Sequence, residues 1–151
     1  MKYRAADPEF PPMEENEIKE LLNQPIYLRM AMINERDGTP LVHPIWYYYE
    51  DEKFFAVSNK TGVKIRSLMK NPEVYFLVDI SARGVRGGAS AKVIDDPAYA
   101  KKITSRNLIR YFGSADSPES KERIELAKKY SVIEITPHFM ASWKAWIDAH
   151  V

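Results

Sequence analysis

The polar residues with the clearest chemical potential lie where a predicted strand meets a predicted helix. Ser58, Lys60 and Lys64 follow a strand expected at residues 54–57 and lead into a short helix expected at about 63–70. A helix N-terminus exposes unpaired backbone N–H groups, and nearby hydroxyl and ammonium groups add donors and positive charge. The pattern therefore indicates an anion site suited to a phosphate, although the spacing alone also fits an ordinary turn with solvated lysines.

Several other chemistries have no support in the sequence. The chain contains no cysteine, which excludes disulfides, a thiolate nucleophile, Cys-ligated zinc and thiol redox chemistry. It has no P-loop, no Gly-x-Ser-x-Gly motif and no His-Glu-x-x-His motif. The histidines His43, His138 and His150 fall in different predicted elements, so we expect no metal site.

Length and charge restrict the class of protein. The chain has 151 residues, which suffices for one domain with its own core. Lys and Arg number 22 against 21 Asp and Glu, and a net charge of only +1 argues against a nucleic-acid-binding protein. The sequence shows no signal peptide and no apolar run long enough to span a bilayer, so we expect a cytoplasmic protein.

Apolar periodicity and turn residues predict an extended N-terminal arm, residues 1–13, and a single domain, residues 14–151. Strands followed by inserted helices indicate an α+β, mainly β fold, a small barrel with helices outside. The first three strands are expected to form an antiparallel meander, because Asp37-Gly38 favours a hairpin. The predicted strands cover 26–33, 41–49, 54–57, 74–78, 88–94 and 132–136, and the predicted helices 14–23, 63–70, 97–112, 118–130 and 137–147.

A longer stretch of sequence resembles a known family. It contains a Gly-x-Pro-x-x-x-Pro-x-Trp strand at 38–46, a strand ending at Ser58, then Lys64, and a helix ending in Leu-x-x-Asn-Pro at 68–72. In this order the motifs resemble the FMN-binding split-barrel family, the pyridoxamine 5′-phosphate oxidase-like group. Later segments resemble a returning strand and the last strand and helix of that family, so the resemblance covers about 15–146.

The resemblance implies a six-stranded antiparallel split β-barrel with peripheral helices. It also implies a homodimer that holds a flavin at its interface, with Lys64 and Ser58 on the FMN phosphate and Asn59 and Lys60 assisting. The residues implied to contact the cofactor are Pro44, Ile45, Trp46, Tyr47, Val57, Ser58, Asn59, Lys60, Lys64, Arg86 and Trp143.

Within this set the residues have different implied roles. The segment from Pro44 to Tyr47 would border the isoalloxazine ring. Arg86 and Trp143 would reach the flavin of the other subunit, although Trp143 also fits the buried stripe of the last predicted helix. In such a protein the flavin carries the hydride chemistry, which agrees with the absence of an evident acid–base pair.

The implied function is an FMN-dependent oxidoreductase acting on a small molecule, with NAD(P)H as a candidate electron donor. The C-terminus has no Arg-x-His substrate motif, so pyridoxamine phosphate oxidation itself is not expected. The sequence identifies no catalytic residue. A flavin carrier without turnover would have the same sequence signature.

Two alternatives remain open. Split-barrel relatives also bind the deazaflavin F420, whose longer acidic tail would need further cations such as Arg66, Arg83 and Arg86. A single-stranded nucleic-acid binder is a different class, and the aromatic run 46–49 is the feature that suggests it. Strand alternation places neighbouring rings of this run on opposite faces, which counts against one stacking platform.

Overall fold

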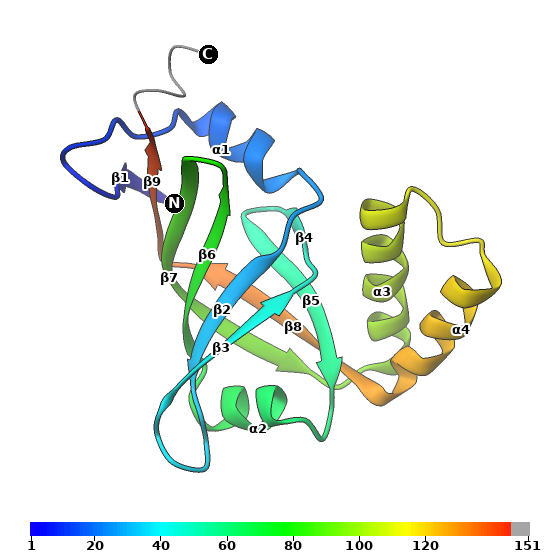
Figure 1. The fold of residues 1–151 in the computed structure, drawn as a ribbon. Helices are drawn as coiled ribbons and strands as arrows, with labels where there is room; N and C mark the ends of the chain where they lie inside the picture. The colour runs from blue at the N-terminus through cyan, green and yellow to red at the C-terminus, as the bar shows by residue number, and fades with distance from the viewer. Residues whose placement is uncertain (146–151) are drawn as a thin grey trace.

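Alternation of buried and exposed side chains builds the strands of this fold. In β2 (Leu28–Ile33), Leu28, Met30 and Met32 are buried, and the positions between them are more exposed. The computed structural model describes residues 1–145, and its strands form one nine-stranded sheet (Figure 1). The other strands are β1 (Lys2–Ala5), β3 (Pro40–Ile45), β4 (Tyr48–Glu50), β5 (Lys53–Asn59), β6 (Glu73–Ile80), β7 (Arg83–Ile94), β8 (Tyr130–Pro137) and β9 (Phe139–Lys144). The α-helices are α1 (Glu15–Leu22), α2 (Val63–Lys70), α3 (Pro97–Phe112) and α4 (Pro118–Leu126).

The sheet curls into a barrel that stays open on one side. Its strand order is β3-β2-β6-β7-β8-β5-β4, so β3 and β4 form the two ends although they are consecutive in the chain. In Figure 1, α1 lies at one end of the barrel, α2 at the other, and α3 and α4 stand to one side. The predicted class, an antiparallel split barrel with peripheral helices, is confirmed, with nine strands rather than six.

The predicted three-stranded meander is present only in part: β2 and β3 pair antiparallel across the Asp37-Gly38 turn as expected, but the second predicted strand is broken. Residues 41–49 do not form one strand, because the chain leaves β3 after Ile45 and starts β4 at Tyr48, which pairs with β5 instead of β2. The break is held by Tyr47, whose side chain turns into the core and whose hydroxyl donates to the carbonyl of Leu22 over 3.0 Å. Pro44, which has no N–H to donate, lies in the edge strand β3 as expected.

The predicted last helix is also wrong. Phe139–Lys144 form β9, which pairs antiparallel with the first part of β7 and parallel with β1. The strand β7 is longer than predicted, and its residues from Arg83 to Arg86 gain a second hydrogen-bonding partner from β9. The remaining part of that predicted helix, including Trp146 and Ile147, lies outside the described residues.

Capping residues determine where α3, the longer helix beside the barrel, begins and ends. Asp96 caps α3 by accepting a hydrogen bond from the backbone N–H of Tyr99, and Gly113 ends the helix with a φ of 81°. The α3 face toward the barrel packs Ala100 and Ile103 against β8. No helix within residues 1–145 has the length and apolar character needed to cross a membrane.

Candidate functional site

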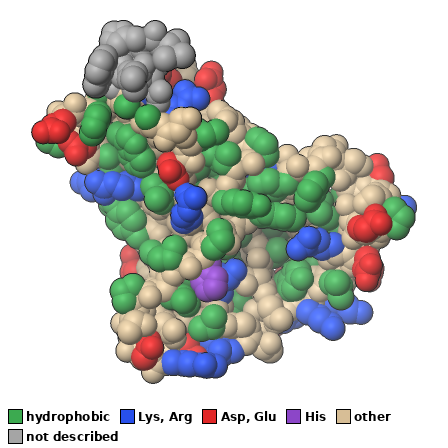
Figure 2. Space-filling view, viewed as in Figure 1, with side chains coloured by type: hydrophobic (Ala, Val, Ile, Leu, Met, Phe, Trp, Pro, Cys, Tyr) green, Lys and Arg blue, Asp and Glu red, His purple; other side chains and the backbone are tan. Residues whose placement is uncertain are grey.

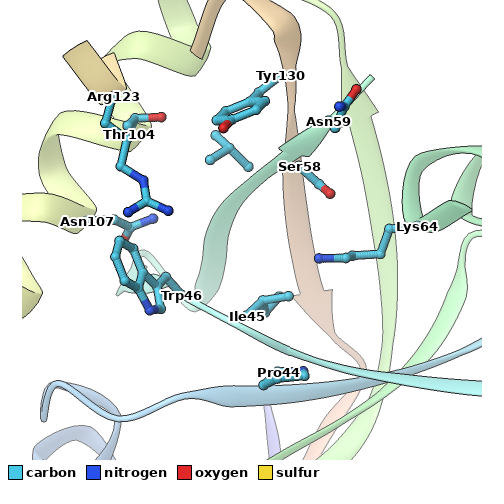
Figure 3. A pocket seen from close by; sticks show the side chains of 11 residues that line it. Pro44, Ile45, Trp46, Ser58, Asn59, Lys64, Thr104, Asn107, Arg123 and Tyr130 are labelled. Atoms are coloured by element: carbon cyan, nitrogen blue, oxygen red, sulfur yellow. The ribbon is translucent and has the colours of Figure 1, made fainter. Parts of the chain in front are cut away.

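A cavity of about 390 Å³ lies between the open barrel and the α3–α4 pair (Figure 3). Its size is within the range of about 300–1,000 Å³ that is typical of small-molecule sites. The barrel, the start of α2 and both outer helices all contribute to its walls. The lining residues are Pro44, Ile45, Trp46, Val57, Ser58, Asn59, Lys64, Thr104, Asn107, Arg123 and Tyr130.

Seven of the eleven residues proposed from the sequence line this single cavity. They come from the end of β3 and the link after it, from the end of β5, and from the first turn of α2. The split in the sheet brings these segments together, because the chain crosses the open side between β3 and β4. The seven residues are Pro44, Ile45, Trp46, Val57, Ser58, Asn59 and Lys64.

One side of the cavity favours an anion. The Lys64 side chain is partly buried and points into the cavity beside Ser58 (Figure 3). Among residues 1–145 its ammonium group has no ion-pair or hydrogen-bond partner, and burial lowers its pKa below the usual value. The first turn of α2 contains no acidic residue and no side-chain cap, so its backbone N–H groups stay available.

His43 lies near enough to Lys64 for the lysine charge to affect the pKa of its imidazole. Burial and the positive charge of Lys64 both lower the pKa of the His43 imidazole below its usual value. Its Nε2 atom is buried without a hydrogen-bond partner in the described part of the chain. The depressed pKa means that His43 adds no cationic charge to this side of the cavity near neutral pH.

The opposite side offers a flat aromatic wall. The ring of Trp46 stacks on that of Tyr111 at 5.1 Å, and the Arg123 guanidinium lies 4.8 Å from the centre of the Trp46 ring. Pro44 and Ile45 continue the apolar surface along β3. Such a surface suits a planar, largely apolar ring system.

The helix α3 adds two polar side chains that the sequence analysis missed. Thr104 and Asn107 stand one turn apart on the buried face of α3, and their exposed fractions are only 5% and 2%. Thr104 Oγ1 and Asn107 Oδ1 have no hydrogen-bond partner among the described residues. In the sequence, these two residues could have been identified as polar positions on the apolar face of the helix, next to Ile103 and Leu108.

Two predicted contact residues near the cavity point elsewhere. Tyr47 is fully buried in the core, and its ring packs against Phe54 at 5.2 Å. Lys60 forms an ion pair with Asp95 at 2.5 Å and does not line the cavity. The Tyr47 side chain is therefore part of the core, and the Lys60 side chain contacts Asp95 outside the cavity.

Arg86 and Trp143 lie together but away from the cavity. They border a separate small hollow beside the N-terminal arm. Arg86 donates hydrogen bonds to the hydroxyl of Tyr75 and to the carbonyl of Ala6, and Trp143 packs over Gly84. Within one chain both residues therefore support the β7–β9 region, and their contact with a second subunit's cofactor stays a prediction.

Residues 1–145 also bear on the expectations for nucleic-acid stacking and for a metal site. The aromatic run 46–49 is not an open stacking platform, because Tyr47 is buried and Tyr48 stacks on Phe55 at 4.8 Å. No group of three or more acidic, histidine or cysteine side chains in residues 1–145 could hold a metal ion.

Comparisons with known proteins agree with the fold. The family model described as pyridoxamine 5′-phosphate oxidase matches residues 14–144. The conserved hypothetical protein Rv2991 from Mycobacterium tuberculosis is 24% identical, with a TM-score of 0.78 over 93% of this chain and 89% of that one. An F420 reductase is 22% identical, with a TM-score of 0.69 over 85% and 98% of the two chains. A FAD-binding protein from Mesorhizobium loti is 20% identical, with a TM-score of 0.65 over 89% and 97%. No curated protein sequence matches the chain significantly.

Proposed function

The chain belongs to the pyridoxamine 5′-phosphate oxidase family, and from this premise we propose that it is an oxidoreductase that binds FMN in the cavity between the barrel and α3–α4. The observation that carries the proposal is the ammonium of Lys64 at the start of α2, which has no partner in residues 1–145 and lies opposite the flat wall of Trp46. A ligand with a phosphate at one end and a planar ring at the other would satisfy both sides.

The residues of this chain would bind and orient the cofactor. Lys64, the Ser58 hydroxyl and the N–H groups at the start of α2 would hold the phosphate. Trp46 and Ile45 would cover the ring, and α3–α4 would exclude water from one side of it. When bound, FMN supplies the capacity to accept and donate hydride, while the protein supplies position and electrostatics.

The unpaired polar atoms of the cavity support a ligand of this kind. A buried ammonium or carbonyl oxygen without a partner costs free energy, and a ligand that pairs it recovers that cost. The Lys64 ammonium would pair with an anion, whereas Asn107 Oδ1 would accept a hydrogen bond from a donor on the ligand. An FMN molecule carries both kinds of group at well-separated positions.

A second copy of the chain would complete the site. Tyr27 and Phe112 are 52% and 65% exposed, and they flank Tyr111 and Trp46 in one aromatic cluster beside the cavity. Hydrophobic side chains also spread between the barrel and the outer helices in Figure 2. Covering this surface by a homodimer would remove apolar area from water.

Calorimetric titration with FMN tests the proposal. We expect Lys64→Ala to weaken FMN binding about 10- to 100-fold, since a hydrogen bond to a charged group contributes about 1.5–3 kcal/mol. Lys60→Ala is the matched control, because Lys60 pairs with Asp95 outside the cavity, and it should bind FMN as the wild type does. Absence of FMN binding at micromolar concentrations would refute the proposal.

Binding of F420 is the second candidate, supported by the similarity to a protein described as an F420 reductase. Of the cations considered for an acidic tail, Arg66 is already paired with Glu35 at 3.1 Å, and Arg86 is bonded within its own hollow. Arg123, which the sequence did not suggest, lines the cavity in addition to Lys64. Titration with both cofactors separates the candidates, and tighter binding of F420 would replace FMN in the proposal.

A further inference from the structure

The α3 side of the cavity carries polar side-chain atoms that have no hydrogen-bond partner in residues 1–145. Asn107 donates its Nδ2 to the carbonyl of Phe55 over 3.5 Å, which orients the side-chain amide. Its Oδ1 is thereby left as a free acceptor, buried and without a partner in residues 1–145. An acceptor in this position repels a phosphate or carboxylate and is satisfied by an N–H or O–H group of a ligand.

The hydroxyl of Thr104 is also buried without a hydrogen-bond partner in residues 1–145. A threonine within a helix commonly bonds its hydroxyl to a backbone carbonyl of the preceding turn. The Thr104 hydroxyl makes no such bond, although the residue is only 5% exposed and lines the cavity. A hydroxyl that is buried and unpaired costs free energy in the ligand-free protein, and a ligand group that pairs with it would recover that cost.

Arg123 adds a donor beside this pair. Figure 3 shows its guanidinium on the same side of the cavity as Asn107, over the ring of Trp46 and across from Lys64. The α3–α4 side therefore presents one acceptor, Asn107 Oδ1, together with donors from Arg123 and Thr104. The complementary ligand edge has an N–H next to a carbonyl oxygen.

From this arrangement we propose that Asn107, Thr104 and Arg123 read the imide edge of a planar heterocycle, with Asn107 accepting its N–H. The inference rests on the proposed function, because the flavin ring carries such an edge, an N3–H between two carbonyl groups. The deazaflavin ring has the same edge, so the assignment holds for either cofactor. Lys64 binds the phosphate at one side of the cavity, and the α3–α4 pair fixes the opposite end of the ligand.

A flavin methylated at N3 provides the direct probe. We expect the wild-type protein to bind N3-methyl-FMN at least about tenfold more weakly than FMN, because the methyl group removes the donor that Asn107 needs. In Asn107→Ala the acceptor is gone and space is opened, so the two ligands should bind within about twofold of each other, a difference well below one hydrogen bond. Lys102→Ala, a change on the exposed face of α3, should keep the full wild-type discrimination.

A second variant separates recognition from structural support. Thr104→Val keeps the shape of the side chain and removes the unpaired hydroxyl. We expect the ligand-free variant to unfold at the same temperature as the wild type or a higher one, and to bind FMN more weakly. A lower unfolding temperature with unchanged FMN affinity would show that Thr104 only supports the fold.

The outcomes distinguish failure of the inference from failure of the proposed function. If FMN binds in a Lys64-dependent manner but N3-methyl-FMN binds equally well, the imide assignment is wrong and the cofactor proposal stands. The same holds if Asn107→Ala retains the wild-type preference for FMN. If the wild-type protein binds neither flavin, the proposed function fails, and the assignment of the α3–α4 wall falls with it.

Discussion

Replacement of Lys64 by methionine should change stability and ligand affinity in opposite directions. The side chain is partly buried and its ammonium has no partner within residues 1–145, so the ligand-free protein carries the cost of desolvating this charge. Methionine has a similar shape without the charge. We expect Lys64→Met to raise the free energy of unfolding by about 0.5–1 kcal/mol, since the group is not fully buried and water still screens it.

The pH dependence of this difference identifies its cause. Because the pKa of Lys64 is lowered in the folded protein, the unfolded chain binds more protons at this position than the folded one. The charged lysine therefore destabilises the wild type below its folded pKa, and the penalty disappears as the pH approaches about 10.4, the usual value of lysine. The advantage of Lys64→Met should be complete near pH 7 and shrink toward that value.

Urea unfolding of the ligand-free proteins at several pH values measures the change in stability. Titration with FMN measures the change in affinity. The same substitution should weaken FMN binding about 10- to 100-fold through the lost contact with the phosphate. A Lys64→Met protein that is less stable than the wild type at neutral pH would refute the reasoning, because Lys64 would then have a stabilising partner. A stability gain that is independent of pH would show that desolvation of the charge is not its source.

Three further predictions concern other parts of the fold and site. Gly84→Ala should lower the free energy of unfolding in urea by about 1–3 kcal/mol, because the added Cβ would lie 2.6 Å from the Trp143 ring; an unchanged unfolding midpoint would contradict this. Burial and, to a smaller extent, the charge of Lys64 lower the pKa of His43, so phosphate bound at Lys64 should raise this pKa in an NMR titration by offsetting that charge; a constant pKa would place the anion elsewhere. Arg123→Met should weaken FMN binding about 10- to 100-fold through the lost hydrogen bond from a charged group and alter the fluorescence of Trp46, on which the guanidinium lies; equal binding would remove Arg123 from the site.

The part of the site that the sequence revealed is the part built from one continuous stretch. Ser58 and Lys64 are brought together by the end of β5 and the helix that follows it, and Trp46 lies in the link between β3 and β4. The spacing of Ser58 and Lys64 indicated only that an anion could bind there, and the resemblance to the family added Trp46 and the expected cofactor. The side chains from α3 and α4 were missed because their position depends on how a distant helix pair packs against the barrel, which periodicity does not show.

Two local patterns predicted the wrong structure because pairing elsewhere decided it. The pattern of residues 41–49 predicted one unbroken strand. In the structure, the buried Tyr47 separates β3 from β4, and the barrel is open between them. The apolar spacing of Phe139, Met140 and Trp143 fits a helix, but the long β7 offers an edge on which this segment adds as a strand. Short apolar runs fit both helices and strands, and tertiary hydrogen bonding selects between them.

A crystal structure of the protein with FMN would show directly where and how the cofactor binds. We expect the phosphate within hydrogen-bonding distance of Lys64 Nζ and the start of α2, the ring against Trp46, and its N3–H directed at Asn107. FMN bound outside this cavity, or with its phosphate on the α3–α4 side, would refute both the proposed function and the orientation of the ligand.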